Sequence, residues 1–271
     1  MSFLTREDNK QVYFEDYGSG TDAIILVHGW GMSCRLWDYS LTALCKRGLR
    51  VVLIDHRGCG QSSKDFADQG INAIASDVVA LVESLELKRV VLNGWSLGGA
   101  VVVEAANSLG DSCAGVVLTC GATPAYLQKP DFPYGGTDDA LAETLAAMST
   151  DRINFLAALS QGICASEISQ DQLQWMWQIF TKSSPMAAQA LGELGPLDQR
   201  EILAKLSMPI LSFVGAKDLV VDPDVCRSVK ETNPAAQIVE MADSGHAPFI
   251  DETAKYNSEF INFIHACLGQ Q

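Results

Sequence analysis

The sequence of 271 residues has no long hydrophobic run and few basic residues. No apolar stretch approaches the roughly 20 residues that a membrane-spanning helix needs. The N-terminus has no basic segment followed by an apolar one, as a secretory signal would. Lys and Arg number 19 against 33 Asp and Glu, a net charge of −14 that argues against nucleic acid and anionic membrane surfaces as partners. We therefore expect no nucleic-acid or membrane partner and a cytoplasmic location.

Paired cysteine motifs are also missing. The eight cysteines are scattered singly, without a Cys-x-x-Cys spacing. Several stand in apolar runs, as Cys120 does, where a free thiol behaves as a small hydrophobic group. The chain also has no cluster with metal-ligand spacing, no phosphate-binding loop and no dinucleotide fingerprint. We expect reduced cysteines, no metal and no cofactor.

What the sequence does have is a repeated alternation of strand-like and helix-like segments. The strand-like runs are continuously apolar rather than alternating, which is typical of strands buried on both faces of a parallel sheet. The alternation with helices predicts an α/β fold with a mostly parallel central sheet and flanking helices. The expected strands are 12–17, 23–27, 51–54, 90–95, 114–119, 209–215 and 237–241; the expected helices include 37–46, 71–86, 100–109 and a final amphipathic one.

Residues 124–195 break this pattern, because they contain no convincing strand and several helical stretches interrupted by Pro and Gly. We predict a core of residues 1–123 and 196–271 with a helical lid, residues 124–195, inserted between two strands. The alternative is that this stretch only extends the core. Its aromatic residues either line an apolar acyl pocket or pack the lid on the core; they are Trp175, Trp177 and Phe180.

The strongest chemical signal is a serine between glycines, Ser96, at the end of the strand 90–95 and the start of a helix. This is the Gly-x-Ser-x-Gly pattern in its required context. A nucleophile must stand clear of the sheet on a sharp, strained turn, and the small residues Gly94 and Gly98 let strand and helix approach closely. The free N–H groups at the helix start would then point at a developing oxyanion.

A serine hydroxyl needs a base, and the chain has only four histidines. His28 and His56 stand in Gly-rich turns, where a structural role is expected, and His265 falls in the final helix. His246 follows the last strand directly and is the best candidate for the base.

The acid that orients the imidazole should come from another strand end, since ligands bind at the carboxyl ends of parallel strands. Asp218 follows the strand 209–215, and Asp222 is the alternative. For the oxyanion, we predict the backbone N–H groups of Leu97 and Trp30 as donors, and both residues as part of the substrate site.

These motifs together resemble the α/β-hydrolase family over essentially the whole chain. The resemblance implies the α/β-hydrolase fold and a Ser–His–Asp mechanism without a cofactor. The residues that carry it are His28-Gly29-Trp30-Gly31, Asp55-x-Arg57-Gly58-x-Gly60-x-Ser62, Gly94-Trp95-Ser96-Leu97-Gly98-Gly99, Gly215-x-x-Asp218 and Gly245-His246.

Within that family, the serine and histidine motifs are most similar to those of pimeloyl-acyl-carrier-protein methyl ester esterases. Those enzymes hold an acidic carrier protein through basic lid residues, whereas this lid has three basic and eight acidic residues. The stretches 55–58 and 198–200 are more similar to cofactor-free esterases and perhydrolases.

We therefore expect a carboxylesterase that acts on small or medium acyl esters through an acyl-enzyme. The alternatives are the carrier-protein esterase, a perhydrolase, or a ligand receptor that retains a slow hydrolase pocket. Either a monomer or a homodimer is compatible with the sequence.

Overall fold

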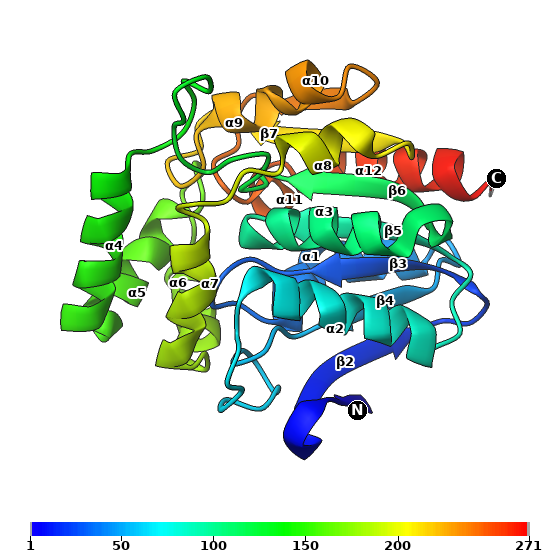
Figure 1. Ribbon diagram of the computed structural model, residues 1–271, viewed down its shortest axis with the longest axis horizontal. Helices are drawn as coiled ribbons and strands as arrows, with labels where there is room; N and C mark the ends of the chain where they lie inside the picture. Colours follow the sequence, from blue (N-terminus) through cyan, green and yellow to red (C-terminus); the bar gives the residue numbers. More distant parts are fainter. Residues whose placement is uncertain (1, 270–271) are drawn as a thin grey trace.

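Eight strands form one sheet, in the spatial order β1 (Ser2–Thr5), β2 (Gln11–Tyr17), β4 (Val51–Ile54), β3 (Asp22–Val27), β5 (Arg89–Trp95), β6 (Cys113–Thr119), β7 (Ile210–Gly215) and β8 (Gln237–Met241) (Figure 1). The computed structural model describes residues 2–269. The strands β4, β3, β5, β6, β7 and β8 pair in parallel, whereas β1 and β2 join antiparallel at one edge. The predicted, mostly parallel sheet is confirmed.

The central strands are buried because helices cover both faces of the sheet. One face carries α2 (Ile71–Ser84), α3 (Leu97–Leu109) and α8 (Arg200–Lys205); the other carries α1 (Asp38–Cys45), α11 (Pro248–Asp251) and α12 (Thr253–Leu268) (Figure 1). Residues 23–27 of β3 and all of β4 are buried. The continuous apolar runs therefore predicted these strands correctly. Two short helices, α9 (Pro223–Arg227) and α10 (Val229–Thr232), connect β7 to β8.

Three helix boundaries and one strand differ from the sequence-based expectation. The helix expected at 100–109 begins three residues earlier, at Leu97. The helix expected at 71–86 ends at Ser84, because Glu86 has a φ of 52°, outside the helical region. The helix expected at 37–46 is a 3₁₀ turn, Cys34–Trp37, followed by α1. The edge strand β1 was missed because its residues are mostly exposed and carry no periodic pattern.

Four helices gather beyond the carboxyl ends of the parallel strands, at the left of Figure 1: α4 (Asp138–Thr150), α5 (Arg152–Gly162), α6 (Gln170–Thr181) and α7 (Ala188–Glu193). Three begin at side-chain caps, in which Thr137, Asp151 and Ser169 accept hydrogen bonds from backbone N–H groups of the first turn. We keep the prediction that residues 124–195 act as a lid, since these helices lie over the strand ends where the candidate residues are found.

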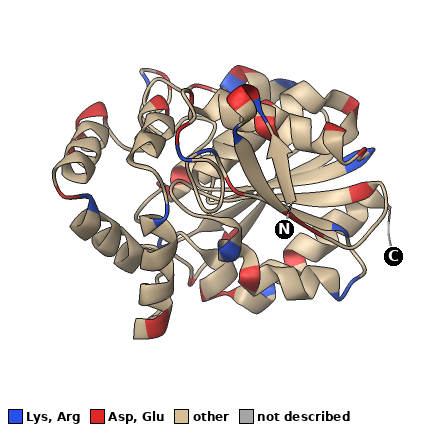
Figure 2. Cartoon of the chain, turned by 90° about the horizontal axis from the view of Figure 1, so that it is seen from below, with Lys and Arg blue, Asp and Glu red and all other residues tan. Residues whose placement is uncertain are grey.

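Acidic and basic positions are spread over many elements of the chain (Figure 2). The stretch 124–195 is strongly one-sided, with eight acids against Lys129, Arg152 and Lys182. In the part of the chain that the structure describes, no helix is both long and apolar enough to cross a membrane.

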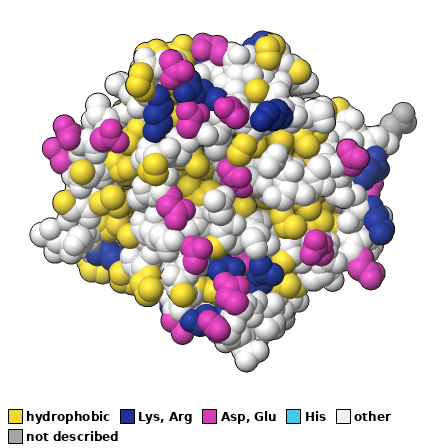
Figure 3. Space-filling view, viewed as in Figure 1, with side chains coloured by type: hydrophobic (Ala, Val, Ile, Leu, Met, Phe, Trp, Pro, Cys, Tyr) yellow, Lys and Arg dark blue, Asp and Glu magenta, His cyan; other side chains and the backbone are white. Residues whose placement is uncertain are grey.

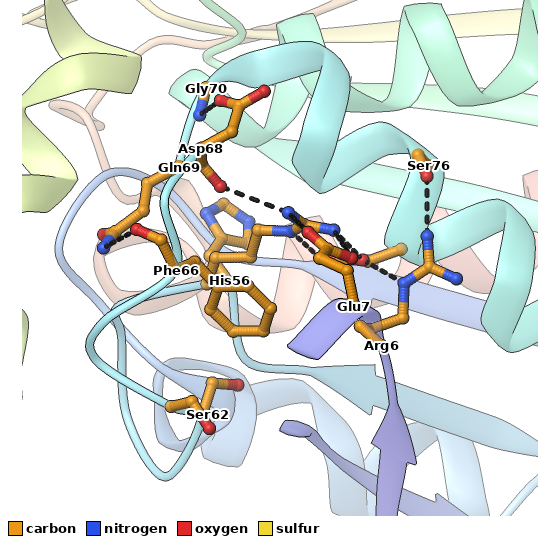
Figure 4. A network of polar contacts seen from close by, with 12 residues as sticks. Arg6, Glu7, His56, Ser62, Phe66, Asp68, Gln69, Gly70 and Ser76 are labelled. Carbon is orange, nitrogen blue, oxygen red and sulfur yellow. Dashed lines mark hydrogen bonds and ion pairs between the residues drawn. The ribbon is translucent and has the colours of Figure 1, made fainter. Parts of the chain in front are cut away.

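A buried ionic network fixes the loop after β4 (Figure 4). The guanidinium of Arg57 donates to both carboxylate oxygens of Asp77 on α2, over 2.6 and 2.8 Å, and contacts Glu7. Arg6 donates a further hydrogen bond to Asp77, over 2.7 Å. The ring of Phe66 lies 4.6 Å from the Arg57 guanidinium. The network joins the N-terminal segment, the loop 55–70 and α2.

We predict that Asp77→Asn lowers the free energy of unfolding by about 3 kcal/mol, because it removes the buried carboxylate that Arg57 and Arg6 share and leaves Arg57 with only the half-exposed Glu7. Urea denaturation measures the change. The matched control is Asp224→Asn, which breaks the exposed pair with Arg227 and should cost less than about 1 kcal/mol. Equal losses in the two variants would contradict a special role for the buried network.

Candidate active site

Ser96 occupies a strained turn between β5 and α3. Its φ of 56° and ψ of −124° lie in a region that side chains rarely adopt. The turn is tight: a Cβ atom on Gly94 would lie 2.1 Å from the Gly98 carbonyl oxygen, and one on Gly98 would lie 2.5 Å from the Val27 carbonyl oxygen. Glycine is therefore required at both positions, as the spacing predicted. The turn keeps Ser96 partly exposed at the end of the sheet.

Asp218 and His246 meet at the ends of the two neighbouring strands β7 and β8. The Nδ1 atom of His246 lies 2.7 Å from Oδ2 of Asp218, and both residues are buried. The other carboxylate oxygen accepts hydrogen bonds from the N–H groups of Val220 and Val221, over 2.8 and 3.0 Å. The carboxylate is thus fixed on one side by backbone donors and on the other by the imidazole, which leaves Nε2 of His246 as the ring nitrogen that could accept a proton.

The alternative acid, Asp222, has a different task. Its side chain caps α9 by accepting from the Asp224 N–H over 2.9 Å and also accepts from the Gly135 N–H over 3.0 Å. These bonds use both of its carboxylate oxygens away from the imidazole, so the geometry favours Asp218 as the partner of His246.

Ser96 and His246 line the same cavity, which has a volume of about 80 Å³. Trp95, next to Ser96 in the chain, donates its indole N–H to the carbonyl oxygen of His246 over 2.6 Å, and its ring centre lies 4.9 Å from that of the imidazole. The His246 N–H in turn donates to the Ile163 carbonyl oxygen over 2.7 Å. The loop that carries His246 is thereby held to β5 and to the end of α5.

The two expected oxyanion donors border this cavity. Leu97 is the first residue of α3 and Trp30 follows β3; both line the cavity. Among residues 2–269, neither N–H donates a hydrogen bond to another protein group, so both are free to bind a substrate oxygen. The Trp30 side chain donates its indole N–H to the Ala187 carbonyl oxygen over 2.9 Å, which ties this loop to the segment before α7.

Of the three aromatic residues proposed to line the pocket, only Phe180 does so. The expectation for Trp175 and Trp177 is wrong. The ring of Trp175 packs against Tyr39 at 5.9 Å between centres, and Trp177 borders a separate surface hollow between α5 and α6. Phe180 instead shares the buried face of α6 with Met176.

Most of the cavity wall was missed by sequence reasoning. Besides the expected residues it is made of apolar side chains from the helices over the strand ends and from loops. One pattern in the sequence could have indicated part of this wall. Apolar residues recur at a spacing of four at Phe155, Leu159 and Ile163, which places them on one face of α5 and its end. The further lining residues are Trp95, Ala122, Tyr126, Thr144, Leu191, Leu194 and Val220.

His28 and His56 lie elsewhere and pack on each other, with ring centres 3.8 Å apart. Nδ1–H of His28 donates to the Gly29 carbonyl oxygen, and its Nε2 accepts from the His56 N–H over 2.9 Å. Burial lowers the pKa of His28 and lowers that of His56 well below its usual value. Both rings therefore support the loop of Trp30, as expected. His265 borders a groove on α12, away from the cavity.

One group of side chains could in principle hold a metal among the described residues. The ligand atoms of Cys120, Asp218 and His246 lie within 4.8 Å of one another. The contact between Asp218 and His246 already uses the ring nitrogen and the carboxylate oxygen that a metal would need. We therefore assign these atoms to the orientation of the imidazole.

A family described by the alpha/beta hydrolase fold matches residues 22–253. The chain belongs to this family. The solved structure of the esterase EaEST from Exiguobacterium antarcticum superposes with a TM-score of 0.92 at 25% identity, over 97% of this chain and 98% of that one. The sheet that carries Ser96, Asp218 and His246 at its strand ends is therefore the sheet of an α/β-hydrolase fold.

Two similar relatives cover nearly the whole chain. The AB hydrolase superfamily protein YisY of Bacillus subtilis is 29% identical over 97% of this chain and 99% of its own length. A pimeloyl-[acyl-carrier protein] methyl ester esterase of Aeromonas hydrophila is 30% identical over 95% of this chain and 99% of its own. Family membership and these relatives support hydrolase chemistry for the chain.

We predict that the protein loses stability as the pH falls below about 6.5, the ordinary pKa of histidine. The folded-state pKa values of His28 and His56 lie below this value. On acidification the unfolded chain therefore binds more protons than the folded one, which stabilises the unfolded state and lowers the free energy of unfolding. Each ring contributes up to about 1.4 kcal/mol per pH unit below that point. Thermal unfolding from pH 8 to pH 5 measures the effect.

The variant His56→Leu should reduce this pH dependence while keeping the backbone N–H bond to His28. His265→Gln, on the partly exposed side of α12, should leave the dependence as it is. An unchanged slope in His56→Leu would show that other groups cause the acid sensitivity.

Proposed function

We propose that the protein is a carboxylic ester hydrolase that acts through an acyl-serine intermediate. The observation that carries this proposal is the hydrogen-bonded pair of Asp218 and His246, 2.7 Å apart, opening on the same cavity as Ser96 in its strained turn. In this scheme His246 Nε2 takes the proton of Ser96 Oγ as the oxygen attacks the ester carbonyl. Asp218 holds the ring in the required tautomer and stabilises the imidazolium.

The N–H groups of Trp30 and Leu97 bind the oxyanion that forms. Each such donor typically stabilises the transition state by roughly 2.7–4 kcal/mol. His246 then returns its proton to the leaving alcohol, and water, activated by the same ring, releases the acid and regenerates Ser96. Both halves of the reaction use the same groups, and neither needs a cofactor.

The cavity supports small or medium acyl esters as substrates. Its volume of about 80 Å³ is modest, and its wall is apolar apart from Ser96, His246, Tyr126 and Thr144. The Tyr126 hydroxyl donates to the Val220 carbonyl oxygen over 3.1 Å, so it is already partnered. Contact with such a wall stabilises a bound apolar acyl chain, because it removes apolar surface from water. A carboxylate on the acyl chain, held directly against the same wall, would lose its hydration.

An acidic carrier protein is disfavoured as the partner, although some relatives bear the name of carrier-protein esterases. The lid stretch 124–195 is strongly acidic. Two of its three cations bond to the protein itself: Lys129 donates to the Gly195 carbonyl oxygen over 2.7 Å, and Arg152 donates to Ser183. Like charges would repel an acidic partner.

The direct test is Ser96→Ala with p-nitrophenyl butyrate as substrate. We expect turnover to fall by roughly 10⁴-fold or more, because no other group can form the acyl-enzyme. Circular dichroism and thermal unfolding should match the unaltered protein. Substantial residual turnover in the variant would rule out the acyl-serine mechanism.

The cavity wall predicts how acyl length is selected. Phe180→Ala enlarges the cavity and should shift the preferred p-nitrophenyl ester toward longer acyl chains. Trp177→Ala removes a larger ring on the same helix but outside the cavity, and should leave the preference unchanged. The ratios of kcat/KM across acetate, butyrate, hexanoate and octanoate esters measure this. A shift of equal size in both variants would contradict the assignment of Phe180 to the acyl site.

A further inference from the structure

Arg152, the first residue of α5, carries a guanidinium that is held on one edge only. Its Nη2 donates to the carbonyl oxygen and the hydroxyl of Ser183, over 2.7 Å each, and over 3.4 Å to the Phe180 carbonyl oxygen. Its Nε is buried and has no hydrogen-bond partner. Among residues 2–269, Nη1 has none either. All three acceptors are neutral, so the charge of Arg152 is positioned by the protein but not compensated by it.

The acid directly before Arg152 in the chain and the acid at the end of α7 are both directed elsewhere. Asp151 accepts from the backbone and side chain of Asn154, and Glu193 accepts from the Ile71 N–H and from Gln189. The thiol of Cys59 lies near Arg152, but burial raises its pKa to about 12, so it is neutral at physiological pH. By contrast, Arg57, Arg200 and Arg227 each hold carboxylates in ion pairs.

Arg152 lines a hollow of about 450 Å³ between α4 and the segment leading into α7. No acidic residue lines this hollow; its other lining residues are Leu145, Met148, Ser149, Pro185 and Ala188. Figure 3 shows basic surface bordered by hydrophobic surface on the side of the molecule where α4 lies. A cation in an otherwise apolar hollow is a suitable site for a single carboxylate attached to an aliphatic chain.

The hollow lies next to the cavity of Ser96, because residues close together on α4, α5 and α7 line the two, although no residue lines both. Thr144 lines the cavity and Leu145 lines the hollow; Leu191 and Phe155 line the cavity about one helical turn beyond Ala188 and Arg152, which line the hollow. Arg152 therefore stands about one helical turn, roughly 4.5 Å along the axis of α5, from Phe155 in the cavity wall.

We propose that Arg152 is a specificity-determining residue that binds a carboxylate at the far end of the ester substrate, so that the preferred substrates are half esters of medium-length dicarboxylic acids. The inference rests on the proposed esterase function and names its substrate class. It also agrees with the acidic lid, which repels a large acidic protein while one inner cation captures a small anion.

The experiment compares monomethyl and dimethyl suberate, which differ only in the free carboxylate, with hydrolysis followed by titration of the released acid. Arg152→Gln should lower kcat/KM for the half ester by at least tenfold more than for the diester, with the loss mainly in KM. Arg152→Lys should restore part of the difference, since it returns the charge without the planar fork. Lys182→Gln removes an exposed lid cation and should change neither substrate's kinetics.

A second variant leaves Arg152 and its bonds to Ser183 intact. Ser149→Asp places a carboxylate in the same hollow and should compete with the substrate anion, so it should show the same selective loss for the half ester. Equal losses on both suberate esters in Arg152→Gln, without selectivity in Ser149→Asp, would overturn the inference and leave a structural role for Arg152. Failure of the unaltered protein on p-nitrophenyl butyrate would instead overturn the proposed esterase function itself.

Discussion

The close approach of strand β5, helix α3 and the end of strand β3 is the constraint on which the candidate site depends. Gly94 and Gly98 face each other and the Val27 carbonyl group at distances that leave no room for a side chain. This contact forces the residue between the glycines into a strained backbone conformation. The same contact brings Leu97 and the loop of Trp30 to one cavity. A single packing requirement therefore places both the candidate nucleophile and the candidate oxyanion donors.

The core of the fold could be predicted because its strands are buried on both faces. Such strands leave continuous apolar runs in the sequence, as at 51–54, and their carboxyl ends meet at one edge, which is why Asp218 and His246 could be paired from position alone. The strand β1 left no such trace, since it lies exposed at the sheet edge. His28 and His56 could be set aside correctly from their Gly-rich turns, although their stacking could not be foreseen.

The helices over the strand ends were harder to predict, because their role depends on which face of each helix meets the cavity. Trp175, Trp177 and Phe180 lie within six residues of one another on α6, yet successive residues are rotated by about 100° around a helix, so only Phe180 reaches the cavity. Arg152 gave no signal in the sequence. Its uncompensated charge becomes visible only when Phe180 and Ser183 are seen to satisfy one edge of the guanidinium.

The hydrogen bond from the Trp95 indole to the His246 carbonyl oxygen has a mechanical consequence. Ser96 and His246 are separated by 150 positions in the chain, and the helices of residues 138–193 lie between them in the sequence. The indole belongs to the residue directly before Ser96, so this bond joins the turn of the hydroxyl directly to the loop of the imidazole. The same loop also bonds to the Ile163 carbonyl oxygen at the end of α5, so a movement of that helix would act on the imidazole against the restraint of the indole bond.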